Sequence, residues 1–170
     1  MEIQITQDLV QKKSITPNDA GCLQYIEDFL TQRGFINETL TFGRVKNLWS
    51  VKRNNGPLLV FLGHVDVVPT GPENEWEHDP FSGYDDGTFI NGRGTGDMKG
   101  GIACFMSALS RIDVDSLNYS IGFLITADEE GPSKDGTVKV VEELLQRNEK
   151  IDYCLIGEPS TLENVGDNIR

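Results

Sequence analysis

The sequence predicts an α/β fold with a largely parallel mixed sheet and helices on both faces. Short apolar runs that are typical of buried strands occur at residues 58–62, 119–126 and 151–156. Segments with apolar residues at helical spacing lie between these runs, at 98–112 and 138–145. Strands that alternate with helices in this way form βαβ units, and the strands of such units lie parallel in one sheet.

The composition is that of an ordinary globular protein, with 38% hydrophobic and 25% charged residues in a chain of 170. This length suits one domain with a sizeable core. The formal net charge of −12 argues against nucleic acid and anionic membranes as partners. Because the sequence has neither a basic-apolar leader nor a membrane-spanning apolar run, we expect a cytoplasmic protein. Cys22, Cys104 and Cys154 are far apart, and we expect free, buried thiols.

The N-terminal part is predicted to contain two helices and two strands before the first buried strand. A short helix is expected over residues 5–12. A capping hydroxyl followed by proline is typical of a helix N-terminus, so Thr16 and Pro17 predict the start of the second helix. Alternating apolar and polar residues at 40–42 and 48–51 predict half-buried strands.

A long segment without periodicity, residues 69–86, is rich in Pro, Gly, Asp and Glu. Its length predicts a functional loop, with His78 at the surface and a contact with substrate as the alternative. A glycine-rich stretch then leads to the helix expected over 98–112. We therefore expect Asp97 in the first turn of that helix, where the partial positive charge of the N-terminus favours a carboxylate.

A histidine and several acidic residues come directly after the predicted buried strands. His64 and Asp66 follow the first of these strands, and their side chains are expected to share a face because residues two apart in an extended chain point the same way. Glu129 and Glu130 follow the next strand, and Glu158 follows the last. In open α/β sheets, ligands bind at the carboxyl ends of the strands.

Together with Asp97, these residues form a set of ligands that zinc accepts, namely one imidazole and several carboxylates. A carboxylate can also bridge two ions about 3.5–4 Å apart. Taken singly, each feature has a simpler interpretation: a histidine hydrogen-bonded to a nearby acid, a helix cap, a solvated loop end or an ordinary strand terminus. Their occurrence together at four element ends favours a metal site.

Five motifs make the sequence resemble the dinuclear zinc amidohydrolases and peptidases of the M20 family. They are GHVDVVPTG, W…DPF, GRGTGDMKGG, TADEEGPSKDGT and IGEPS…VGD, in order from Gly63 to Asp167. SITPNDAGC near the N-terminus also fits, so the resemblance covers nearly the whole chain. It implies a zinc-peptidase-like catalytic domain. The fourth and fifth motifs favour the members that hydrolyse N-succinyl-L,L-2,6-diaminopimelate to succinate and diaminopimelate, a step toward lysine.

The resemblance implies a metal-binding role for four residues. His64 and Glu158 would bind one Zn²⁺ ion, Glu130 would bind a second, and Asp97 would bridge both, with Co²⁺ as an alternative metal. The implied substrate is a small N-acyl amino acid. Other reactions of the family, deacylation of a different N-acyl amino acid or cleavage of a dipeptide, stay open at this point.

Two further residues are implied to act beside the ions. Asp66 would orient His64, fixing the tautomer of its ring and raising its basicity. Glu129 would be the general base, which takes a proton from the attacking water and passes it to the leaving amine.

Members of the family are considerably longer and form homodimers through an inserted dimerisation domain. The resemblance thus implies that residues 1–170 are the N-terminal portion of the catalytic metal-binding domain, truncated before the dimerisation domain and the C-terminal catalytic segment. A histidine for the second zinc ion would lie in the missing part, so we expect incomplete occupancy of that site and little or no turnover. The alternative to an enzyme is a fragment that binds metal and has no turnover of its own.

Overall fold

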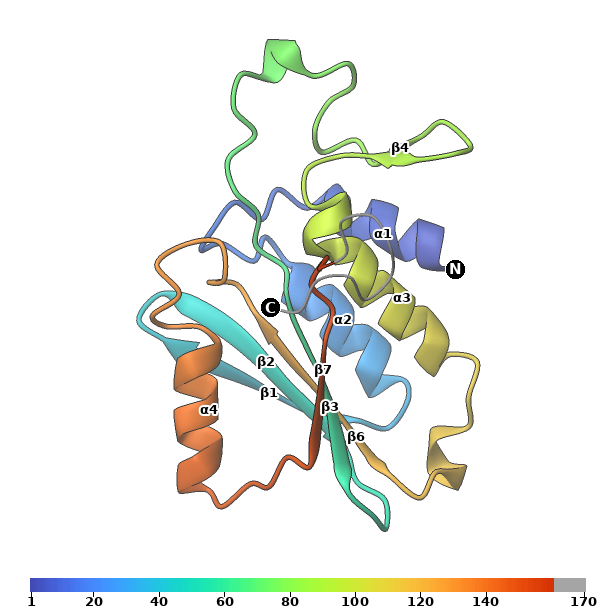
Figure 1. Ribbon diagram of the computed structural model, residues 1–170, viewed down its shortest axis with the longest axis vertical. Helices are drawn as coiled ribbons and strands as arrows, with labels where there is room; N and C mark the ends of the chain where they lie inside the picture. The colour runs from blue at the N-terminus through green and yellow to red at the C-terminus, as the bar shows by residue number, and fades with distance from the viewer. Residues whose placement is uncertain (161–170) are drawn as a thin grey trace.

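A five-stranded sheet in the order β1-β2-β6-β3-β7 forms the centre of the molecule (Figure 1). The computed structural model describes residues 1–160. β3 pairs in parallel with both β6 and β7, whereas β2 runs antiparallel to β1 and β6. The mixed sheet predicted from the sequence is therefore confirmed. Its strands are β1 (Ile36–Phe42), β2 (Val45–Lys52), β3 (Leu58–His64), β6 (Ser120–Thr126) and β7 (Tyr153–Ile156).

Helices cover both faces of the sheet, as predicted (Figure 1). One face packs against three helices, α1 (Glu2–Val10), α2 (Cys22–Thr31) and α3 (Gly100–Leu109), and the other against α4 (Thr137–Gln146). Within residues 1–160, every helix is too short or too polar to span a bilayer.

Short elements connect these layers. Two of them, β4 (Tyr84–Asp85) and β5 (Ile90–Asn91), pair as a small hairpin that stands away from the sheet (Figure 1). Single turns of 3₁₀ helix occur at Glu73–Glu75 and Val114–Ser116, and an irregular turn at Thr95–Lys99 precedes α3. The segment predicted as a functional loop therefore contains one helical turn and the first strand of the hairpin.

The predicted start of the second helix is wrong. α2 begins at Cys22, after Gly21, whose φ of 83° lies in the left-handed region. Thr16 instead belongs to a segment that pairs with the chain beyond β3, where its amide donates to the carbonyl oxygen of Val67 at 3.0 Å. The capping signal at Thr16 is overridden because Thr16 and Pro17 form a turn, which the amide of Asn18 closes by donating to the carbonyl oxygen of Ile15 at 3.0 Å.

Two strands differ from the predicted burial. β2 is buried over nearly its whole length, because it lies inside the sheet and has helices on both faces. β7 was expected to be buried, yet Tyr153, Leu155 and Ile156 are about half exposed, at 57%, 49% and 55%. β7 is an edge strand, and the helices of the described part do not cover it. Cys104 and Cys154 are likewise exposed, contrary to the prediction, and only Cys22 is a buried thiol.

Three aromatic rings form the centre of the larger core. Phe61 of β3 stacks on Phe105 of α3 with ring centroids 3.6 Å apart, and it meets Phe123 of β6 edge-on at 5.7 Å. Phe61 is only 2% exposed. This cluster joins the strand that ends at His64 to the helix that follows Asp97, so packing in the core fixes the distance between these two segments.

We expect the Phe61→Ala substitution to lower the free energy of unfolding by about 3–5 kcal/mol, because it removes a buried ring and leaves a cavity. Equilibrium unfolding in urea measures this loss. Phe89→Ala is the matched control, since Phe89 is 69% exposed and its removal should change stability by less than about 0.5 kcal/mol. Similar losses in both variants would contradict the assignment of Phe61 to the core.

Candidate metal centre

The histidine and the acidic residues predicted from the sequence lie together at one edge of the sheet. His64 is the last residue of β3, Glu129 and Glu130 lie in the loop after β6, and Glu158 lies just beyond β7. These three strands are parallel neighbours, so their carboxyl ends meet at the same edge. Asp97 reaches this edge from the turn before α3.

His64 is the centre of the cluster and is only 1% exposed. Its Nδ1 lies 2.9 Å from the carbonyl oxygen of Asp66, which can only accept, so Nδ1 carries the proton. Its Nε2 lies 3.0 Å from Asp97 Oδ1, 3.1 Å from Glu158 Oε1 and 3.8 Å from Glu129 Oε2. Three acceptors around one ring nitrogen require either a proton or a cation at that position.

The raised pKa of His64 indicates a proton at Nε2 when no metal is bound. Burial acts to lower this pKa, but the contacts with Asp66 and the charge of Glu158 outweigh burial and raise it to about 9. In the metal-free protein the ring is therefore an imidazolium ion at neutral pH.

Asp66 lies behind His64 and is fully buried. Its Oδ1 is 3.5 Å from His64 Nδ1, in agreement with the prediction that the two side chains share a face. The carboxylate also accepts hydrogen bonds from the backbone amides of Glu129, at 3.2 Å, and Glu130, at 3.1 Å. Burial acts to raise the pKa of Asp66, but the bond with His64 and the bond from the Glu129 amide lower it overall. Asp66 thus joins the end of β3 to the loop after β6.

The remaining carboxylates face a more open side of the cluster. The side chains of Asp97 and Glu129 are 51% and 52% exposed, and that of Glu158 is 26% exposed. Burial, together with repulsion from Asp97 and Glu129, raises the pKa values of Glu130 and Glu158. Negative charges at this spacing repel one another, and a divalent cation among them would remove the repulsion.

Two groups of possible ligands share the imidazole of His64. One contains Asp97 and Glu130, the other Glu129 and Glu158, and in each group the ligand atoms lie within 4.8 Å of one another. One imidazole with several carboxylates is a donor set suited to zinc. The residues at this edge therefore fit a divalent metal ion.

The predicted helical position of Asp97 is wrong. Asp97 has φ −122° and ψ 99°, outside the helical region, and α3 begins only at Gly100. The reason lies at Met98, which is fully buried in the core and accepts a hydrogen bond from the backbone amide of His64 to its sulfur at 3.2 Å. Placing Met98 there turns the chain, and the carboxylate of Asp97 then points at the ring of His64.

Asp128 is not among the predicted site residues, yet it shapes the loop that carries Glu129 and Glu130. Asp128 is 3% exposed, and its Oδ2 accepts hydrogen bonds from the amides of Lys134 and Asp135, both at 3.0 Å. In the sequence it is the first of three consecutive acidic residues. The one signal in the sequence that could have identified Asp128 as buried is its position just beyond the strand β6.

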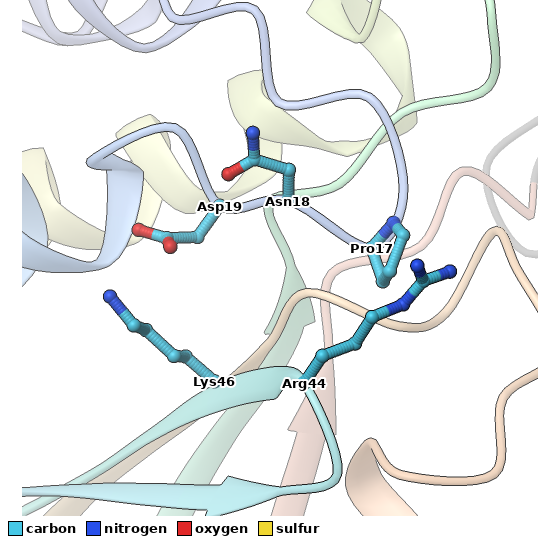
Figure 2. Close-up of a pocket in the computed structure, with 5 residues that line it drawn as sticks. All are labelled: Pro17, Asn18, Asp19, Arg44 and Lys46. Atoms are coloured by element: carbon cyan, nitrogen blue, oxygen red, sulfur yellow. The ribbon is translucent and has the colours of Figure 1, made fainter.

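A separate pocket lies between the β1–β2 turn and the loop before α2 (Figure 2). Figure 2 shows Arg44 and Lys46 extending toward Pro17 and Asp19, with Asn18 turned away from the strand. The pocket contains none of the six predicted site residues.

Comparison with known proteins now identifies the family. The model of peptidase family M20/M25/M40 matches residues 60–170, which include all six predicted site residues. The chain belongs to the M20 family. The resemblance carried by the five motifs is thereby confirmed, although the VGD motif at the end of the fifth lies outside the described residues.

Two curated relatives carry the same name. Succinyl-diaminopimelate desuccinylase of Marinobacter nauticus is 51% identical over 170 residues, and that of Hydrogenovibrio crunogenus is 53% identical over 171 residues. In both cases the match covers 99% of this chain and 45% of the relative. The chain therefore spans slightly less than half the length of these relatives.

Solved structures share the fold at lower identity. Human carnosine dipeptidase 1 has a TM-score of 0.82 at 20% identity, over 94% of this chain and 38% of its own. The M20 family metallo-carboxypeptidase Sso-CP2 from Sulfolobus solfataricus has a TM-score of 0.81 at 22% identity, over 94% and 37%. The fold is thus that of M20 metallopeptidases.

We expect the affinity of the chain for Zn²⁺ to increase as the pH rises from about 6 to about 8.5. Because the folded-state pKa of His64 is about 9, the ring must lose a proton before Nε2 can bind a metal. Calorimetric titration in two buffers of different ionisation enthalpy measures the protons released. His78→Asn should leave this release unchanged, and an unchanged release in His64→Asn would contradict the assignment.

Proposed function

We propose that this chain forms part of a metal-dependent amidohydrolase that cleaves N-succinyl-L,L-2,6-diaminopimelate to succinate and L,L-diaminopimelate. The observation that carries the proposal is the convergence of three carboxylates on Nε2 of His64 at the carboxyl edge of the sheet. The name shared by relatives at 51% and 53% identity supports the choice of substrate. In this proposal the reaction is a step of diaminopimelate and lysine biosynthesis in the cytoplasm.

We infer that the centre holds two Zn²⁺ ions, with Co²⁺ as an alternative. His64 and Glu158 would bind one ion, Glu130 the other, and Asp97 both. The short distances from His64 Nε2 to Asp97 and Glu158 support the first ion. The grouping of His64, Asp97 and Glu130 supports a carboxylate shared between two ions. When bound, the ions supply positive charge that polarises an amide carbonyl.

Glu129 is the proposed general base. Its side chain is 52% exposed, so its carboxylate can reach a water molecule and a leaving amine, whereas its backbone is held by Asp66. The carboxylate would accept a proton from the attacking water and deliver it to the amine nitrogen as the amide bond breaks. Asp66 would keep the ring of His64 in the tautomer with the proton on Nδ1.

We further propose that residues 1–170 fold as the N-terminal portion of the catalytic metal-binding domain. This chain covers 45% of the length of the relatives. The dimerisation domain and the C-terminal catalytic segment would lie in the part of the relatives that the match does not cover. Within residues 1–160, His64 is the histidine of the cluster, so a complete second site would need another ligand. The 170-residue chain should therefore bind the second ion weakly and turn over slowly, and the homodimer should need the longer form.

We expect Glu129→Gln to lower hydrolysis of N-succinyl-L,L-2,6-diaminopimelate by at least about 100-fold, because an amide cannot accept the proton. Zinc content should not change. The rate is measured both in the 170-residue chain and in a chain extended with the C-terminal part of the Marinobacter nauticus relative. Glu75→Gln, in an exposed 3₁₀ turn, is the control. Undiminished activity in Glu129→Gln would show that another group is the base.

The substrate itself is tested by comparing acyl groups. We expect the extended chain to hydrolyse the N-succinyl substrate faster than the N-acetyl analogue and faster than a dipeptide. The assay measures kcat/KM for the three compounds with the same metal-loaded preparation. A preference for the acetylated compound or for the dipeptide would reassign the substrate while leaving the metal centre intact. Bound zinc without hydrolysis of any of the three would instead favour a metal-binding fragment.

A further inference from the structure

Lys99 has a fully buried side chain, although lysine is almost never fully buried unless its charge is compensated. Its ammonium group donates hydrogen bonds to two backbone carbonyl oxygens, those of Leu9 and Lys12, both at 3.0 Å. The proposed reaction assigns no role to this charge. The partners of Lys99 indicate what the charge does.

Leu9 lies in the last turn of α1, and Lys12 lies two residues beyond its end. The end of a helix carries unpaired carbonyl groups and a partial negative charge, which a nearby cation stabilises. α1 has no basic residue in its own last turn. Lys99 supplies the missing cation from 90 residues further along the chain.

Lys99 also closes the turn that carries Asp97. Its backbone amide donates to the carbonyl oxygen of Gly94 at 2.9 Å. Gly94 has a φ of 82°, and a methyl group there would lie 2.4 Å from Val67 Cγ1 and 3.4 Å from Lys99 Cδ. The stem of Lys99 therefore lies against this turn, and the hydrogen bond from its amide to Gly94 ties the turn to Lys99.

The segment just beyond α1 is attached to the other side of the metal centre. Ser14 donates from its hydroxyl to the carbonyl oxygen of Val65 at 2.7 Å, and Val67 donates from its amide to the carbonyl oxygen of Ser14 at 2.9 Å. Val65 directly follows His64, and Val65 and Val67 flank Asp66. Residues 9–14 thus contact both segments that supply ligand atoms.

We propose that Lys99 is a positioning residue for the metal centre, which fastens the Asp97 turn to α1 and thereby holds Asp97 in place opposite His64. The link runs from Lys99 through Leu9 and Lys12 to Ser14 and the end of β3. The inference rests on the metal centre proposed above. It explains why a cation is buried two residues after a ligand without contacting the ligand itself.

The test is the Lys99→Met substitution, which keeps the length of the stem and removes the donor. The 170-residue chain is titrated with Co²⁺, whose visible absorption reports ligand geometry, and Zn²⁺ affinity is measured by competition. We expect a changed Co²⁺ spectrum and about a tenfold or greater loss of affinity, the size typical of residues that orient metal ligands.

A stability control separates positioning from loss of packing. Leu144→Ala makes a cavity under α4, on the opposite face of the sheet, and should destabilise the fold without touching the link. Its Co²⁺ spectrum should match that of the unmodified chain. An unchanged spectrum and affinity in Lys99→Met, or equal changes in both variants, would overturn the proposal.

Two further measurements keep the proposal decidable. If Lys99→Met does not fold, Ser14→Ala breaks the same link at its other end, and an unchanged Co²⁺ spectrum in that variant would overturn the inference. If the unmodified chain binds no Co²⁺, the proposed metal centre fails by itself. A crystal structure of Lys99→Met then decides the positioning role, because retention of the 3.0 Å distance between Asp97 Oδ1 and His64 Nε2 would overturn it.

Discussion

A buried carboxylate, that of Asp66, connects the strand ends on which the metal centre is built. It lies against His64 and accepts hydrogen bonds from the backbone amides of Glu129 and Glu130. It therefore fixes the end of β3 relative to the loop after β6. Burying a charge is costly unless hydrogen bonds and an opposite charge compensate it. Those compensating groups are parts of the centre itself, and the fold and the site therefore depend on the same contacts.

The centre has one buried side and one open side that is negatively charged. His64 and Asp66 are almost inaccessible to solvent, whereas the side chains of Asp97 and Glu129 are half exposed. Carboxylates that crowd around one imidazole are stabilised by a proton in the metal-free protein and by a divalent cation when one is bound. The exposed side of the cluster is open to solvent, while hydrogen bonds hold the residues of the buried side.

Local sequence signals predicted most of the regular structure. The apolar runs at β3 and β6 and the helical spacing of α4 predicted their elements, because these segments satisfy packing and propensity at once. The errors occur where a distant contact competes with a local signal. Thr16 pairs with Val67 and does not cap α2. Met98 packs in the core, so Asp97 stands in a turn before α3 and not in its first helical turn.

The sequence by itself determined the family and the mixed sheet, because motif spacing and strand periodicity can be recognised along the chain. The roles of the six site residues stay a prediction. Only the tertiary structure decided how these residues face one another. The contacts of Asp66 with the loop after β6, and of Lys99 with α1, join residues more than 60 positions apart. Such contacts depend on which segments pack side by side in the folded core, and no local pattern of residue types records that arrangement.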